Sequence, residues 1–257
     1  MTTLLYDGTF EGFLTGVFEC HERKLANFRI VRRSGYHPIL AESIIDVLTD
    51  PVKSKRVWEG LKKRLSVEKR NEFYKTFLSE LPEMEQLLIN FIHRVFSSEH
   101  NIEGDFGHVA VIGVTKIAHK VHREKHRMEA FIRFERTKDD LYFSLINPDF
   151  NVLPLISSHF KDRYSDQTWL IFDRRRKYGI HYNCEAGSLS EVQLDLYQET
   201  SGEFLPRSIC HEDEIEYQKL WKNYFESVNI GARKNTKLHI RHVPVRYWRH
   251  LTEKREF

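Results

Sequence analysis

Three histidines at helical spacing are the first residues in this 257-residue sequence that could do chemistry. His119, His122 and His126 recur at i, i+3 and i+7, so a helix would place them on one face, where three imidazoles could bind one metal ion. The same segment, KIAHKVHREKHR, holds five cations, which disfavour a divalent ion. A solvated basic face, or contact with phosphate, is therefore favoured over a metal, and we predict no metal site and no cofactor.

Further basic residues have spacings suited to anions. His159 and Arg163 lie four residues apart in a predicted helix, a spacing that could hold one phosphate or allow general acid–base chemistry beside a cation. The run His122–Phe134 brings cations from a helix end and the next strand to one junction, as phosphate-binding sites do. Residues Arg174–Lys177 are four consecutive cations at a predicted hairpin tip, which favours a counter-anion, although a plain surface loop fits equally well.

The C-terminal segment, residues 229–257, interleaves cations with aromatic residues. Such a pattern is typical of surfaces that follow a nucleic-acid backbone and stack its bases. The alternative is that Trp248 packs into the core and leaves the arginines outside. The residues concerned are Arg233, Asn235, Arg241, Arg246, Tyr247, Trp248 and Arg249.

The net charge of +3 conceals strong segregation along the chain. Residues 229–257 carry a local charge of +6 and residues 116–136 a local charge of +4, whereas residues 185–216 carry −8. This segregation indicates a polyanion-binding surface and a separate acidic face for a basic partner or for self-shielding.

Several classes of protein are excluded. No apolar run approaches the roughly 18 residues of a membrane helix, and Asp7 and Glu11 interrupt any signal peptide, so we expect a cytoplasmic protein without membrane contact. Three widely spaced cysteines predict buried thiols rather than disulfides. The glycine-rich phosphate loop, the dinucleotide fingerprint, the G-x-S-x-G elbow and H-E-x-x-H are all missing from the sequence.

The first part of the chain, residues 1–104, reads as mainly helical. A strand is expected at Leu4–Tyr6, followed by a helix whose apolar residues begin at Phe10 and recur at i, i+3, i+4, i+7 and i+8. Asp50-Pro51 has the signature of an N-cap followed by a first-turn proline, which predicts a helix to about Leu65. Ser66 predicts another helix to Leu78, and Pro82 begins a third.

The second part, residues 105–257, reads as α+β with a basic C-terminal segment, and one continuous domain is the alternative. The expected fold is a helical N-terminal part with a small antiparallel sheet of two hairpins flanked by helices. In the strand expected at Met128–Arg136, Arg133 would face away from Ile132 and Phe134. The remaining predicted elements are a helix over Phe106–Arg127, strands at Leu141–Ile146, Thr168–Asp173 and Tyr178–Asn183, helices over Val152–Tyr164 and Glu212–Ser227, and a short helix after Pro244.

Several long motifs resemble those of one bacterial family. They are TLLYDGTFEGFLTGVFE, REKHRMEAFIRFE, NVLPLISSHFKDRY, DQTWLIFDRRRKYGIHY and LWKNYFESVNIGARKNTKLHIRHVPVRYWRHLTE. The family that they resemble has no known biochemical activity, and its members are labelled probable DNA metabolism or DNA repair proteins. Its gene commonly lies beside one for a radical-SAM DNA repair protein, and the same domain occurs fused to uracil-DNA glycosylase-type domains.

The resemblance covers nearly the whole chain and includes most of the basic positions already singled out. His119 and His122 lie outside its motifs, which weakens the metal interpretation further, and Thr252 stands where the family pattern has proline. The matching polar positions are Arg123, Glu124, His126, Arg127, Arg133, His159, Arg163, Asp173, Arg176, Arg233, Asn235, Arg246 and Glu253.

These observations lead to three functional hypotheses. The first is a DNA-binding accessory protein in DNA repair or DNA modification, acting with a radical-SAM protein and with a uracil-DNA glycosylase as a further candidate partner. In the second, His126 and His159 perform acid–base chemistry on DNA or nucleotides, and in the third the acidic segment 185–216 makes the chain a protein adaptor that binds no nucleic acid. For the first, the expected nucleic-acid contacts are Arg123, Arg127, Arg133, Arg163, Arg176, Arg233, Asn235 and Arg246.

Overall fold

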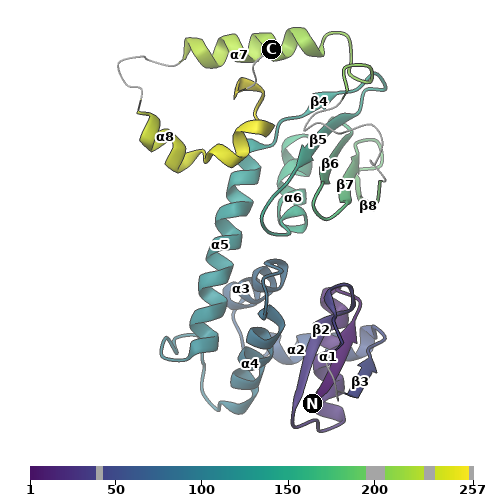
Figure 1. Cartoon of the computed structure of the whole chain (residues 1–257), viewed down its shortest axis with the longest axis vertical. Coiled ribbons are helices and arrows are strands. Elements are labelled where there is room, and N and C mark those ends of the chain that lie inside the picture. Colours follow the sequence, from purple (N-terminus) through teal and green to yellow (C-terminus); the bar gives the residue numbers. More distant parts are fainter. Residues whose placement is uncertain (39–42, 195–205, 229–234, 255–257) are drawn as a thin grey trace. The chain divides into compact units, whose positions relative to one another are not determined.

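The computed structural model describes residues 1–38, 43–194, 206–228 and 235–254. The chain forms two compact units, residues 1–123 and 124–257. Helix α5 (Val109–Phe131) belongs to both, because its first turns lie in one unit and its last turns in the other (Figure 1).

The first unit contains a three-stranded parallel sheet. Strand β1 (Thr2–Tyr6) is central and pairs with β2 (Phe28–Arg32) on one side and β3 (Ser43–Asp46) on the other. Helix α1 (Phe10–Glu22) connects β1 to β2 and begins where the Thr9 hydroxyl accepts a hydrogen bond from the backbone N–H of Gly12. The strand and the helix predicted for this region are confirmed.

Three further helices of this unit begin and end close to their sequence signals. Helix α2 (Pro51–Lys62) starts at its proline after Asp50, and α3 (Val67–Leu78) is capped by Ser66. Helix α4 (Met84–Ser97) buries its apolar face, including Phe91 against Phe73. A short 3₁₀ turn, η1 (Arg33–Gly35), follows β2.

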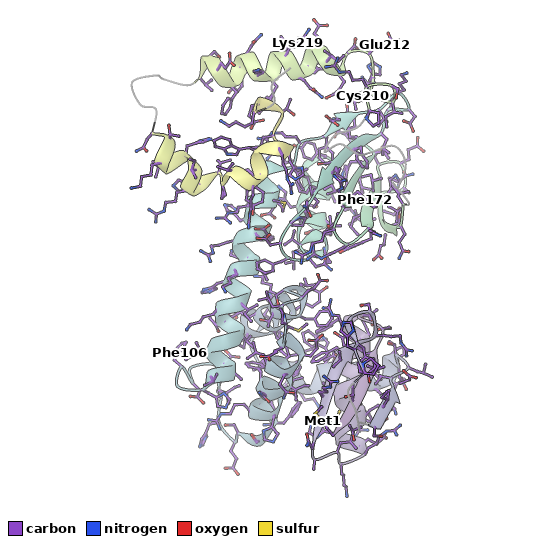
Figure 2. All side chains as sticks on the ribbon, viewed as in Figure 1. Met1, Phe106, Phe172, Cys210, Glu212 and Lys219 are labelled. Atoms are coloured by element: carbon purple, nitrogen blue, oxygen red, sulfur yellow. The ribbon has the colours of Figure 1, made fainter. Side chains whose placement is uncertain are left out.

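The second unit contains a five-stranded mixed sheet in the order β4-β5-β6-β7-β8. Strands β5 and β6 are parallel and joined through α6 (Leu153–Arg163), whereas every other neighbouring pair is antiparallel. Trp169 and Phe172 of β6 are buried, and Figure 2 shows Phe172 among the side chains of the sheet. The strands are β4 (Glu135–Arg136), β5 (Tyr142–Ile146), β6 (Trp169–Asp173), β7 (Tyr178–Asn183) and β8 (Ser188–Val192).

The predicted small antiparallel sheet of two hairpins is wrong. Both hairpins exist, but α6 crosses over so that β5 and β6 run in the same direction, and the two hairpins become one sheet. The expected helical N-terminal part also contains the parallel sheet β2-β1-β3. Of the strand predicted over Met128–Arg136, only Glu135–Arg136 form a strand, whereas the first four residues extend α5 to Phe131, because Met128 and Ile132 have helical spacing and are both buried.

Among the residues that the structure describes, four elements follow the sheet. Helix α7 (Glu214–Ser227) is attached through Gln218, whose side-chain N–H group donates to Glu135 (3.3 Å) and Glu214 (2.9 Å). The others are α8 (Thr236–His242) and the 3₁₀ turns η3 (Val245–His250) and η4 (Thr252–Lys254). Within the described parts of the chain, no helix is both long and apolar enough to cross a membrane.

Candidate nucleic-acid interface

The carboxyl ends of two parallel strands place two loops at the same edge of the second sheet. Ile146, the last residue of β5, is in register with Asp173, the last residue of β6. The loop that leads into α6 and the loop that leads into β7 therefore emerge side by side. In parallel sheets this edge is where ligand sites are built.

Asp173 and Arg176 hold these two loops together from the inside. The Asp173 side chain is fully buried, and its Oδ1 accepts hydrogen bonds from the backbone N–H groups of Arg175 (2.9 Å) and Arg176 (3.2 Å). Its Oδ2 pairs with the Arg176 guanidinium at 2.7 Å, and that guanidinium also donates to the carbonyls of Pro148 and Asp149. Burial raises the pKa of the Asp173 carboxyl, an effect that Arg176 opposes. Arg176, predicted to contact DNA, is thus a buried anchor.

The rest of the β6–β7 loop carries three further cations, of which the Arg175 guanidinium donates to the Asp149 carbonyl at 3.1 Å. Arg174, Arg175 and Lys177 are exposed, and the turn is closed by a 2.8 Å bond from the backbone N–H of Lys177 to the Asp173 carbonyl. Lys177 adopts a left-handed backbone with φ of 58°, as a tight turn requires. We call Arg174, Arg175 and Lys177 the cationic loop.

Glu124 of α5 organises a second cluster next to the same edge. Its buried carboxylate accepts hydrogen bonds from the backbone N–H of Asp149 (3.1 Å), the Arg246 guanidinium (2.8 Å) and the Tyr247 hydroxyl. Arg246 also pairs with the Asp149 carboxylate. Burial, together with Glu124, raises the pKa of Tyr247 to about 12. The predicted DNA contact Arg246 is therefore bound to acidic side chains of its own chain.

Arg127 belongs to the same cluster. Its guanidinium lies 5.9 Å from the centre of the Tyr247 ring and 4.0 Å from Glu124. Like Arg246, it is engaged by neighbouring side chains rather than projecting freely into solvent.

Both predicted catalytic histidines lie beside a third carboxylate, that of Glu129. His126 Nδ1 is 3.8 Å from one Glu129 oxygen, and His159 Nδ1 is 3.9 Å from the other. Lys125 binds the same carboxylate at 2.6 Å. His126 is largely exposed and His159 partly so. The last turns of α5 and helix α6 therefore bring the two histidines together on an accessible face.

Arg133 lies beyond the end of α5 rather than in a strand. Its guanidinium pairs with Glu253 at 2.9 Å, donates to the Ala130 carbonyl at 2.8 Å and lies 5.6 Å from the centre of the Trp221 ring. Burial alone would raise the pKa of Glu253, but Arg133 and the Trp221 N–H outweigh it, and the pKa lies below its usual value. Arg133 thus anchors the C-terminal segment.

The remaining predicted residues are scattered. Arg163 is exposed at the end of α6, with its guanidinium 5.7 Å from the Tyr164 ring, and Arg123 is exposed on α5. The Asn235 side chain caps α8 by accepting from the backbone N–H of Leu238 at 3.0 Å. Arg233 lies outside the described residues. Among the residues that the structure does describe, no three side chains are grouped as metal ligands.

Sequence reasoning missed the acidic partners of these cations. Glu124 and Glu253 pair with residues more than a hundred positions away, so no local signal could reveal them. Glu129 follows Lys125 and His126 at i+4 and i+3, and on a helix this spacing could have predicted that Glu129 is their acidic partner.

Comparison with known proteins gives one finding about the family. The model of a family described as a domain of unknown function, DUF4130, matches residues 82–253. No curated protein matches the chain.

Proposed function

This chain belongs to the DUF4130 family of domains of unknown function, and from that premise and the geometry of the β6–β7 loop we propose that it binds DNA. The observation that carries the proposal is the cationic loop. Its three exposed cations lie on one turn, and the backbone of that turn is fixed from beneath by Asp173 and Arg176. Phosphate oxygens are the natural counter-ions of such a group.

The wider role that we propose is that of an accessory protein in DNA repair or DNA modification. The resemblance of the sequence motifs supports a radical-SAM protein as partner, a uracil-DNA glycosylase as a further partner, and a cytoplasmic location. Glu212, Asp213 and Glu216 are exposed around the start of α7 and offer an acidic face to such a partner. Glu214 is unsuitable for this, because it is buried and accepts from the backbone N–H of Arg136 at 3.0 Å.

Replacing Arg174, Arg175 and Lys177 together with alanine should weaken DNA binding and its dependence on salt. Each lost phosphate contact lowers the slope of log K against log salt by about 0.9 on duplex DNA, so the slope should fall by about 2 to 3. Filter binding or fluorescence anisotropy at several salt concentrations measures this change.

The matched control removes three exposed lysines, Lys55 and Lys62 of α2 and Lys63 at its C-cap, and so changes the net charge equally. This control should keep nearly the wild-type slope. The proposal fails if the wild-type protein has no salt-dependent affinity for single-stranded, duplex or uracil-containing DNA, or if both triple variants lose the same amount.

A second candidate function is acid–base catalysis on DNA or nucleotides, and the shared position of His126 and His159 beside Glu129 favours it. If the two imidazoles act on one substrate, alanine at either position should lower kcat by about 10²- to 10⁴-fold. The assay is conversion of end-labelled uracil-containing, abasic or nicked DNA and of free nucleotides. His119→Ala, on the exposed face of α5, is the control and should keep full activity. Absence of turnover by the wild-type protein on all these substrates removes this candidate.

A further inference from the structure

Helix α7 presents a row of aromatic side chains to solvent. Tyr217, Trp221 and Tyr224 recur at i, i+4 and i+7, which places them on one face of the helix. Their exposed fractions are 60%, 40% and 58%, unusually high for large aromatic residues. None of these three aromatic residues belongs to the Glu124 and Glu129 clusters described above.

Trp221 is the most firmly held member of this row. Its indole N–H donates to Glu253 at 2.9 Å, and Glu253, only 5% exposed, is itself paired with Arg133. The Arg133 guanidinium lies 5.6 Å from the indole centre and braces the ring by a cation–π contact. The Tyr224 ring is 5.7 Å from the indole and inclined by 32°. Two neighbouring rings therefore form a pre-oriented pair that remains accessible.

The charges along α7 distinguish the two ends of the row. Tyr217 follows Asp213, Glu214 and Glu216, which would repel a phosphate. Lys219 and Lys222 each precede one of these two rings by two positions, a spacing that places them on another side of the helix. The cation beside the rings is Arg133, whose guanidinium lies 5.6 Å from the centre of the Trp221 ring. Lys219 is exposed on α7, as labelled in Figure 2. The Trp221–Tyr224 end thus combines exposed rings with the Arg133 guanidinium, and exposed rings beside a cation are the combination that binds single-stranded nucleic acids.

The C-terminal segment connects this pair of rings to the edge that carries the cationic loop. Arg246 binds Glu124 at that edge, and Glu253 binds Arg133 beside Trp221. Glu124 and Phe131 are seven residues apart on α5, which corresponds to about 10 Å of helix.

We infer that Trp221 and Tyr224 form a stacking platform for an unpaired nucleobase of single-stranded DNA. The inference rests on the proposed DNA binding and specifies the form of DNA that the site takes. Stacking uses the π-face that every base has, so the platform binds without sequence preference. The Arg133 guanidinium beside the indole favours a nucleic acid over an apolar protein helix as the occupant.

Alanine at Trp221 should lower the affinity for an oligo-dT strand about five- to a hundredfold and change the affinity for a blunt duplex less than twofold. Trp221→Phe keeps a ring and should stay within about threefold of wild type. Tyr224→Ala leaves the bond from Trp221 to Glu253 intact and should weaken oligo-dT binding in the same direction, which separates loss of stacking from loss of folding. Tyr217→Ala, equally exposed but beside acidic residues, is the matched control.

The results separate the platform from the proposed function. If Trp221→Ala and Tyr224→Ala bind oligo-dT as wild type does, or if Tyr217→Ala weakens binding as much, the platform is overturned. DNA binding through the cationic loop then still stands, provided that the loop variant loses duplex affinity. If wild-type protein binds neither form of DNA, both ideas are overturned.

Discussion

Asp173→Asn is expected to lower the free energy of unfolding by about 3–5 kcal/mol at pH 7. The substitution leaves the buried Arg176 guanidinium facing a neutral amide, and an unpaired buried charge is among the most destabilising changes known. The asparagine Oδ1 can still accept from the backbone N–H groups of residues 175 and 176, so the turn itself is retained. Asp173→Ala removes those bonds too and should cost about 1 kcal/mol more.

Urea unfolding of the full chain, followed by tryptophan fluorescence, measures this loss. Three of the four tryptophans lie in residues 124–257, so the signal reports mainly on the unit that contains Asp173. Asp166→Asn, at an exposed position, is the control and should change the free energy of unfolding by no more than about 0.5 kcal/mol. A loss below about 1 kcal/mol for Asp173→Asn would show that the pair with Arg176 is not an anchor.

Glu124→Ala is expected to be the second most damaging change, lowering the free energy of unfolding by about 2–4 kcal/mol. It removes the acceptor for three donors at once, the Arg246 guanidinium, the Tyr247 hydroxyl and the backbone N–H of Asp149. The loss should be smaller than for Asp173, because Arg246 is partly exposed and water can take over part of its hydrogen bonding. Glu124→Gln keeps an acceptor oxygen and should fall between wild type and alanine.

Hydrogen–deuterium exchange shows which segment of the chain Glu124→Ala destabilises locally. Amides of Val245–His250 should exchange faster in Glu124→Ala, because Arg246 and Tyr247 attach that turn to α5 through Glu124. Lys120→Ala, exposed on the same helix, should leave those amides unchanged. Unchanged exchange in Glu124→Ala would mean that the turn is held by packing of Tyr247 alone.

Local signals in the sequence predicted most of the helices and the strand partners within hairpins. Asp50-Pro51 and Ser66 mark helix starts because a cap acts within three or four residues. The direction of β6 relative to β5 could not be read in this way, since it depends on how α6 packs across the sheet. Strands β2 and β3 are short and only partly buried, so their composition carries little signal.

The sequence could predict the basic residues of the candidate site, but for most of them it could not predict which carboxylates they pair with. Asp173 and Arg176 are three residues apart, and their pairing could have been anticipated. Arg246 with Glu124, and Arg133 with Glu253, are joined only by the folding of the C-terminal segment onto α5. Basic residues that looked equivalent in the sequence therefore differ in the structure. Arg133, Arg176 and Arg246 are paired with carboxylates of their own chain. The exposed basic residues include Arg123, Arg163, Arg174, Arg175 and Lys177.

The geometry of that loop also bears on how fast a polyanion is captured. Arg174, Arg175 and Lys177 lie within four consecutive residues of a turn that the bond from the Lys177 N–H to the Asp173 carbonyl closes, and neighbouring Cα atoms are about 3.8 Å apart. At physiological ionic strength the screening length is about 8 Å. On the proposed DNA binding, we expect an approaching strand to meet these cations as one trivalent charge, so that substitutions in this turn lower the association rate more than equal changes of charge elsewhere on the chain.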